Sequence, residues 1–240
     1  MAYPIQTYDD LLNLIKASGR SFDLEQIEHA YQVAAEAHKE QKRKSGEPYI
    51  THPVAAACIL VELGMDTPCV VAGLLHDVVE DTDITLEEIT KMFGKEIANL
   101  INGVTKLGKV PFSSREEQQA ENIRKMLIAM SEDIRVIIIK LADRLHNMRT
   151  IEYMTPQKQR DKALENMEVY APIADRLGIR AVKEELEDLS LRYLDPMGYQ
   201  EIEHAWNCIK TNALILYKKS KHRYWKKCCP LFQKFIWKAE

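Results

Sequence analysis

The chain has 240 residues, of which 46% are hydrophobic, and this is enough for one sizeable core or for one domain with an appendage. The formal net charge of -3 hides two unlike parts, because residues 205–240 hold nine of the 33 basic residues and only one of the 36 acidic ones. The other 24 basic and 35 acidic residues give residues 1–204 a charge of -11, which excludes a general nucleic-acid-binding surface, since affinity for phosphate needs clustered cations.

The sequence shows no pattern typical of a signal peptide, a membrane span, a disulfide framework or a zinc knuckle. Residues 1–20 are polar and acidic early, without the apolar segment of a signal peptide. The longest uncharged apolar runs, such as VAAACILV at 54–61, are far too short to span a bilayer. Five cysteines at irregular spacing argue against a disulfide framework or a zinc knuckle. We therefore expect a cytoplasmic protein that does not contact the membrane.

Helical periodicity recurs along most of the chain, and glycine and proline are few, so we expect an all-α fold. The first helix opens at Ser21 or Asp23, and the loop at 43–53 ends at Pro53, which is suited to start the next helix. Further helices are expected over 54–64, 68–80, 85–93, 95–106, 115–131, 133–150, 156–176 and 180–194, with a second loop at 108–116 and a helix stop at Gly178.

The run LLHDVVEDT, at 74–82, places ionisable side chains in an apolar helix. His76 and Glu80 lie on nearly the same helix face, as do Asp77 and Asp81. The rest of this helix is apolar nearly all round, which predicts that it is buried. A buried, unpaired carboxylate costs several kcal/mol or more. A cation must therefore compensate these groups, or they face a polar cavity.

A second apolar helix carries a polar stripe, formed by Lys140, Asp143, Asn147 and Thr150 at steps of three, four and three residues. Upstream, His52 lies where the 43–53 loop enters a helix. Two histidines and two aspartates from three segments can ligate one divalent metal through nitrogen and oxygen. The simpler interpretations are a hydrogen-bonded turn histidine at 52, a solvated His-Asp pair at 76–77 and a surface charge pair at 143–144.

The pattern H…HD…D resembles the metal signature of the HD-domain phosphohydrolases, which are helical bundles. The segments RKSGEPYITHP, GLLHDVVEDT, VTKL, KLADRLHNMRT, YAPIADRLGI and ELEDLSLRYLDP resemble the hydrolase domain of RelA/SpoT-type alarmone enzymes of the stringent response. The resemblance covers residues 22 to 203. It implies a manganese ion (Mn2+) as cofactor and removal of the 3′-pyrophosphate of ppGpp and pppGpp, giving GDP or GTP and pyrophosphate.

The resemblance also implies roles for single residues. It implies metal ligation by His52, His76, Asp77 and Asp143, and positioning or activation of the attacking water by Glu80 and Asp81. It implies binding of the nucleotide by Arg43, Lys44, Asn147 and Thr150. The basic run QKRK supplies cations at the expected mouth of the site, whereas the simpler interpretation of that run is a solvated turn.

Two other functions stay open at this point. The HD chemistry can serve another nucleotide, such as a dNTP or a phosphorylated NADP-like compound, although RKSGEPY and HNMRT argue against this. The domain can also bind alarmone without cleaving it, although the intact ligand motif argues against that. In each case the partner is a small nucleotide, and nucleic acid is not expected.

The sequence divides into four parts by composition and resemblance. We expect an N-terminal segment at 1–21, the hydrolase domain at 22–195, a connector at 196–204 and a basic, aromatic tail at 205–240. In long members of the family a synthetase domain follows the segment ending LDP, and the tail does not match it. A frameshifted or truncated reading frame is favoured over a lineage-specific extension, and the tail's cysteines lack the spacing of a zinc finger.

Overall fold

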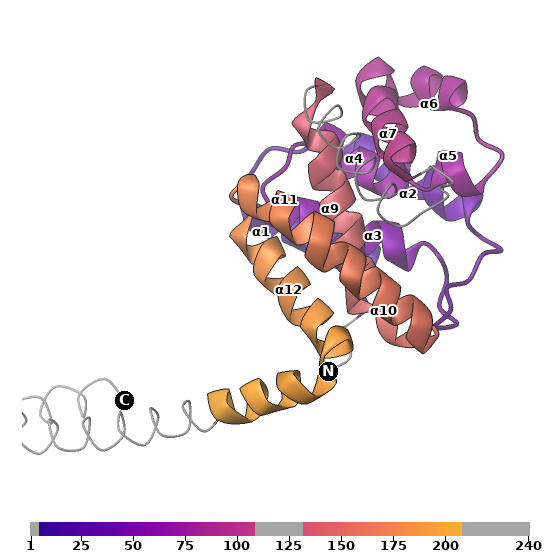
Figure 1. Ribbon diagram of the computed structural model, residues 1–240. Helices are drawn as coiled ribbons and strands as arrows, with labels where there is room; N and C mark the ends of the chain where they lie inside the picture. Colours follow the sequence, from indigo (N-terminus) through magenta and orange to yellow (C-terminus); the bar gives the residue numbers. More distant parts are fainter. Residues whose placement is uncertain (1–4, 109–131, 208–240) are drawn as a thin grey trace, which may run out of the picture. The chain divides into compact units, whose positions relative to one another are not determined.

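The computed structural model describes residues 5–108 and 132–207 (Figure 1). Contacts group the chain into a first unit that ends at Leu194 and a second that begins at Asp195. Within the described residues the regular elements are helices, and an isolated bridge pairs Lys42 with Pro48. The predicted all-α fold is confirmed. The predicted domain boundaries stay predictions.

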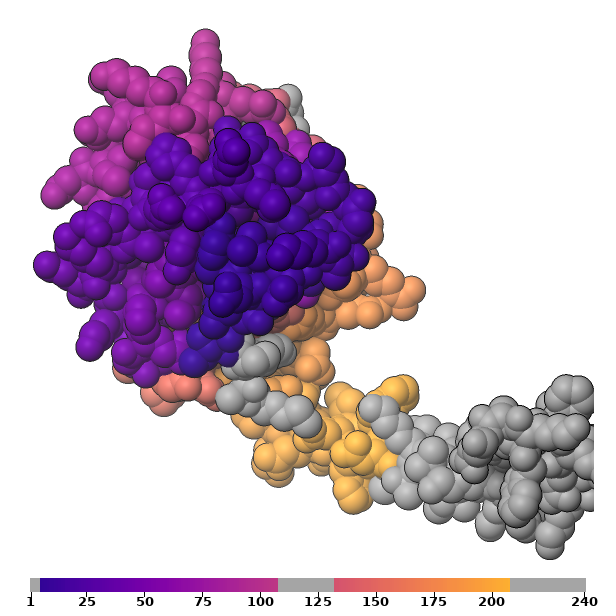
Figure 2. Space-filling model, turned by 180° about the vertical axis from the view of Figure 1, so that it is seen from behind, coloured from indigo at the N-terminus to yellow at the C-terminus, as the bar shows by residue number. Residues whose placement is uncertain are grey.

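The chain opens with helix α1 (Tyr8–Ser18), which the sequence pattern did not predict. Thr7 and Asp10 form a reciprocal capping box at its start, and Leu11 and Ile15 are buried. Helix α2 (Leu24–Ala37) begins after Asp23, whose side chain accepts from the Gln26 N–H, so Asp23 rather than Ser21 is its cap. Figure 2 shows these N-terminal helices, in indigo, forming much of one face of the first unit.

The centre of the first unit is a pair of helices, α3 (Thr51–Glu62) and α4 (Thr67–Leu75), that are apolar nearly all round. Every residue from His52 to Val61 is buried, and so is every residue from Cys69 to Leu75. Their neighbours α1, α2, α7 and α9 cover them. A helix that is hydrophobic on all sides is stable only in such an enclosure. Helix α3 begins two residues before Pro53, so His52 lies in its first turn.

The predicted helix 68–80 is broken in two, at the residues that concern the site. Helix α4 ends at Leu75, and α5 (Val78–Asp81) follows after His76 and Asp77. The Gly73 carbonyl, which would accept from the Asp77 N–H in a continuous helix, lies 2.8 Å from Nδ1 of His76. The imidazole competes for that acceptor, and the regular helix stops there.

Helices α6 (Leu86–Phe93), α7 (Lys95–Gly108) and α9 (Ile134–Arg149) agree with the predicted elements to within about two residues, as does α12 (Arg180–Leu194). In Figure 1, α9 runs through the middle of the unit, with α7 on one side and α12 on the other, and α9 contacts both. The predicted helix 115–131 and nearly all of the predicted loop 108–116 lie outside the described residues.

The predicted helix 156–176 contains a wider turn. It comprises α10 (Pro156–Glu165), the π-helical segment η2 (Asn166–Tyr170) and α11 (Ala171–Arg176), and the short 3-10 helix η1 (Ile151–Tyr153) precedes it. Pro172 has no N–H to offer the carbonyl one turn earlier, so the regular α-helical ladder cannot continue through it. Gly178, with φ 72°, ends the segment as expected.

The second unit is described only as far as residue 207, and residues 196–207 are helical. Its apolar side chains Met197, Ile202 and Trp206 are 70%, 58% and 55% exposed. The rest of the predicted tail lies outside the described residues. None of the helices in the described ranges is both long and apolar enough to cross a membrane.

Candidate metal centre

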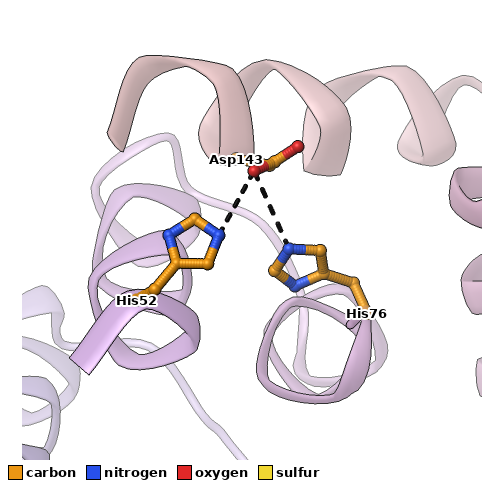
Figure 3. A group of neighbouring side chains, drawn as sticks. All are labelled: His52, His76 and Asp143. Carbon is orange, nitrogen blue, oxygen red and sulfur yellow. Dashed lines mark ion pairs between the residues drawn. The ribbon is translucent and has the colours of Figure 1, made fainter. Parts of the chain in front are cut away.

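Three buried side chains converge from three helices (Figure 3). His52 lies in the first turn of α3, His76 directly follows α4, and Asp143 projects from the middle of α9. Oδ1 of Asp143 lies 3.3 Å from Nε2 of His52 and 3.9 Å from Nε2 of His76. One nitrogen or oxygen atom from each side chain lies within 4.8 Å of the others. The packing of α3, α4 and α9 therefore brings residues distant in sequence to one point.

Asp77 adds a second carboxylate to this cluster. Its Oδ1 lies 3.2 Å from Nε2 of His76, and its Oδ2 lies 3.5 Å from Nε2 of His52. The break between α4 and α5 puts Asp77 beside His76 on the same side of the cluster. All four side chains that the sequence singled out as metal ligands are thus brought together.

The spacing of these atoms fits a divalent metal. Donors at about 2.1 Å from an ion are about 3 Å apart when they are neighbours in its coordination shell, which is near the separations seen here. Nε2 of His76 is buried and makes no hydrogen bond to the described residues, although carboxylate oxygens lie close to it. A buried polar atom without a partner is costly, and a bound cation would satisfy it. The donor set of two imidazoles and two carboxylates suits a borderline divalent ion.

Electrostatics in the cluster favours a cation at this point. Burial raises the pKa of Asp143, but Lys140, with Nζ 2.8 Å from Oδ2, and the two imidazoles outweigh burial and hold this pKa well below its usual range. Against burial, His76 and His52 also lower the pKa of Asp77. For His76 the effect of burial has the opposite sign and lowers the pKa, but the carboxylates of Asp77 and Asp143 outweigh burial and raise this pKa to about 9. A proton and a metal ion therefore compete for the same nitrogen.

Two further side chains, which the sequence pattern missed, hold the cluster in place. The Tyr49 hydroxyl lies 2.8 Å from Oδ2 of Asp77 and 3.2 Å from Oδ2 of Asp81. Nδ1 of His146 lies 2.7 Å from Nδ1 of His52. Burial, together with the charges of His52, Arg43 and Arg149, lowers the pKa of His146 to about 2. In the sequence Tyr49 stands three residues before His52, and His146 three after Asp143.

Glu80 and Asp81 stand on α5, one turn beyond the broken helix. They border a cavity of about 640 Å³, which is also lined by Glu36, Glu40 and Gln41. The backbone carbonyl of Asp81 accepts from Nε2 of Gln41 at 2.9 Å, which ties α5 to the segment that follows α2. The Tyr49 hydroxyl lies within hydrogen-bond distance of both carboxylates and so links Asp81 to Asp77.

Three of the four predicted nucleotide-binding residues lie together. The Arg43 guanidinium donates from Nη2 to Oδ1 of Asn147 at 3.2 Å and to Oγ1 of Thr150 at 3.1 Å. Asn147 donates in turn from Nδ2 to Oδ1 of Asp143 at 2.5 Å. Lys44 is exposed on the same loop as Arg43, where the Gly46 N–H donates to the Arg43 carbonyl at 2.9 Å. The loop at 43–53 is thereby tied to the metal cluster through α9.

Comparison with known proteins gives the same picture. Residues 30–180 match the HD domain family. The chain is 57% identical over 174 residues to a probable guanosine-3′,5′-bis(diphosphate) 3′-pyrophosphohydrolase of Synechocystis, covering 72% of this chain and 23% of that protein. It is 47% identical over 212 residues to the bifunctional (p)ppGpp synthase/hydrolase SpoT of Escherichia coli K12, covering 88% of this chain and 30% of that protein.

A solved structure is also similar, that of a metazoan ortholog of SpoT described as hydrolysing ppGpp. It is 30% identical, with a TM-score of 0.50, over 76% of this chain and 98% of that one. The chain spans about a quarter of the length of the curated relatives it matches. The resemblance inferred from the sequence motifs is confirmed, and the HD domain implies a divalent metal, for which His52, His76 and Asp143 form a candidate site. The chain belongs to the HD-domain family and, within it, to the RelA/SpoT-type proteins.

Proposed function

We propose that the chain is a metal-dependent hydrolase that removes the 3′-pyrophosphate of ppGpp and pppGpp, in the cytoplasm, as part of alarmone turnover. The observation that carries the proposal is the convergence of His52, His76, Asp77 and Asp143 around an unsatisfied buried nitrogen. The names of its relatives, which include two hydrolases of this nucleotide, supply the substrate class.

The metal is proposed to be Mn2+, held by these four side chains. When bound, such an ion supplies Lewis acidity, which favours deprotonation of water near neutral pH and offsets the charge of the pyrophosphate group. The protein contributes a fixed, water-poor donor set, because His52, His76 and Asp143 are all buried. Rigid side chains on packed helices would hold the ion in one place.

Glu80 and Asp81 are proposed to orient the attacking water and to accept its proton. Both border the open cavity beside α5, where water has access. Asp81 shares the Tyr49 hydroxyl with Asp77, so its carboxylate is held close to the metal cluster. A base at hydrogen-bond distance from the nucleophile is the geometric requirement for general base catalysis.

Arg43, Lys44, Asn147 and Thr150 are proposed to hold the nucleotide. The Arg43 guanidinium is planar and suited to stacking on a base or to pairing with phosphate. Its hydrogen bonds to Asn147 and Thr150 fix the position of the guanidinium near Asp143. Lys44 adds an exposed positive charge on the same loop. This local group supplies the cations that the acidic body otherwise lacks.

The test is release of pyrophosphate from ppGpp by the purified protein with Mn2+, with and without a chelator. We expect turnover with the metal and none with the chelator. The same assay with GTP, dGTP and NADPH checks the substrate class, and a higher rate on one of these would reassign it. Equilibrium binding of ppGpp without release of pyrophosphate would instead indicate a binding module.

A further inference from the structure

His52 and His76, the two histidines of the candidate metal site, differ in the partner that lies next to Nδ1 of each ring. Nδ1 of His76 lies 2.8 Å from the backbone carbonyl of Gly73. Nδ1 of His52 lies 2.7 Å from Nδ1 of His146, and the two ring centroids are 4.9 Å apart. A carbonyl can only accept a hydrogen bond, whereas an imidazole nitrogen can accept or donate. The support of His52 therefore depends on where the proton of a second ring lies.

The short distance between the two Nδ1 atoms determines the arrangement of protons. At 2.7 Å one nitrogen must carry a proton and the other a lone pair. Nε2 of His52 faces the carboxylates of Asp143 and Asp77, so a lone pair is needed there to ligate a metal. The proton of a neutral His52 then lies on Nδ1, and Nδ1 of His146 accepts it. His146 must accordingly be neutral, with its own proton on Nε2.

We propose that His146 is a positioning residue, which accepts the His52 Nδ1–H through its own Nδ1 and so holds His52 in the tautomer and ring orientation that present Nε2 to the metal. This proposal rests on the proposed role of His52 as a ligand. The partner that accepts the second N–H of a ligating histidine fixes its tautomer and raises its basicity.

The position of His146 in the fold suits this role. It lies on α9 one turn after Asp143, so a single helix carries one ligand and the support of another. Helices α3 and α9 pack together, and the hydrogen bond between the rings joins them beside the cluster. Thr51, Glu62 and Arg149 border a small cavity together with His146, so the surroundings of this ring are partly polar.

Two substitutions separate the hydrogen bond from the shape of the side chain. His146→Leu fills the site without an acceptor, whereas His146→Asn places an amide oxygen at the same distance along the side chain as Nδ1. Mn2+ affinity, measured by titration of the metal-free protein, should fall about 10- to 100-fold in the Leu variant. It should return to within about threefold of the wild type in the Asn variant. The exposed His29 on α2 offers a matched control, since His29→Leu should leave the affinity unchanged.

A second measurement needs no variant of uncertain folding and no activity. Nitrogen-15 NMR of the histidine rings in the wild-type protein loaded with diamagnetic Zn2+, which removes the need for a proton between Nε2 of His52 and the carboxylates, distinguishes the two neutral tautomers. We expect His52 as the Nδ1–H form and His146 as the Nε2–H form. The opposite tautomers, equal loss of affinity in the Leu and Asn variants, or unchanged affinity in the Leu variant would each overturn the proposal. Correct tautomers with no hydrolysis of ppGpp would leave this inference standing and overturn the proposed function alone.

Discussion

The candidate metal ligands and the proposed nucleotide-binding residues differ in how the fold supports them. His52, His76 and Asp143 are at most 5% exposed and lie on or next to helices whose surroundings are apolar. Arg43 and Lys44 stand on a loop, half-buried and exposed, and Arg43 is held by the side chains of Asn147 and Thr150. The proposed chemistry is thus assigned to packed helices, and recognition to a loop that side chains restrain. Substitutions in the two regions should consequently differ in kind as well as in size.

The largest effect is expected at the metal cluster. Asp77→Ala removes a carboxylate from a site with four protein donors, so both bound Mn2+ and hydrolysis should fall to the level of the chelator-treated protein. Metal content by elemental analysis and pyrophosphate release measure the two quantities. Asp9→Ala, at an exposed position in the first turn of α1, is the matched control and should change neither. Stoichiometric metal in the Asp77 variant would remove Asp77 from the ligand set.

A smaller effect, of another kind, is expected beside the cluster. Glu80→Gln keeps the size of the side chain but removes its basicity, so turnover should fall by about 10²-fold or more while the metal stays bound. Glu87→Gln, on the exposed first turn of α6, tests whether loss of any surface carboxylate matters. Wild-type turnover in the Glu80 variant would show that Glu80 is structural only.

For the proposed nucleotide-binding residues, the change should appear in the binding of substrate. Arg43→Ala removes charge-assisted contacts that are made before the transition state, so KM should rise about 10- to 100-fold with a small change in kcat. Arg43→Lys keeps the charge but loses the planar guanidinium, so its KM should lie between those of the wild type and the Arg43→Ala variant. Arg160→Ala, at an exposed position on α10, is the control. If kcat falls and KM is unchanged, Arg43 belongs with the reacting groups, and the contrast between the two regions is wrong.

The sequence predicts the proposed metal ligands better than the side chains that support them, for a physical reason. His76 and Asp143 are polar residues within apolar helices, and the free energy cost of burying them makes such positions conspicuous in a periodic pattern. The contact of His52 with His146 joins residues 94 positions apart, and no periodicity relates them. Tyr49 is equally inconspicuous, because a tyrosine in a loop has many ordinary roles. The roles assigned to all these residues stay predictions.

The two broken helices have different local causes, a side chain that competes for a backbone acceptor and a proline that lacks a backbone donor. The pattern at 68–80 is apolar apart from His76, Asp77 and Glu80, and propensity alone continues the helix past His76. The break depends on the side-chain conformation of His76, whose ring points toward the Gly73 carbonyl. Hydrophobic periodicity carries no information on the conformation of a side chain. The π-helical segment before Pro172 was more accessible to prediction, because a proline inside a helix always removes a donor. Helix α1 was likewise marked by the capping residues Thr7 and Asp10.

The smallest effect on metal content and activity is expected from removal of residues 205–240. Every proposed site residue lies in the first unit, which ends at Leu194, whereas residues 205–240 are basic and include Trp206, 55% exposed. A chain shortened to residues 1–204 should therefore keep its metal content and its rate of ppGpp hydrolysis within about twofold, and should be more soluble, because exposed aromatic side chains promote association. The measurements are activity, metal content and melting temperature, each compared with that of the full chain.

The contrary outcome would follow if the segment that begins near residue 202 formed a helix with an apolar face and packed on the first unit. Removing it would then expose apolar surface. Aggregation, or a melting temperature lower by several degrees together with lost activity, would show that residues 205–240 belong to the hydrolase fold and that the boundary near residue 204 is wrong.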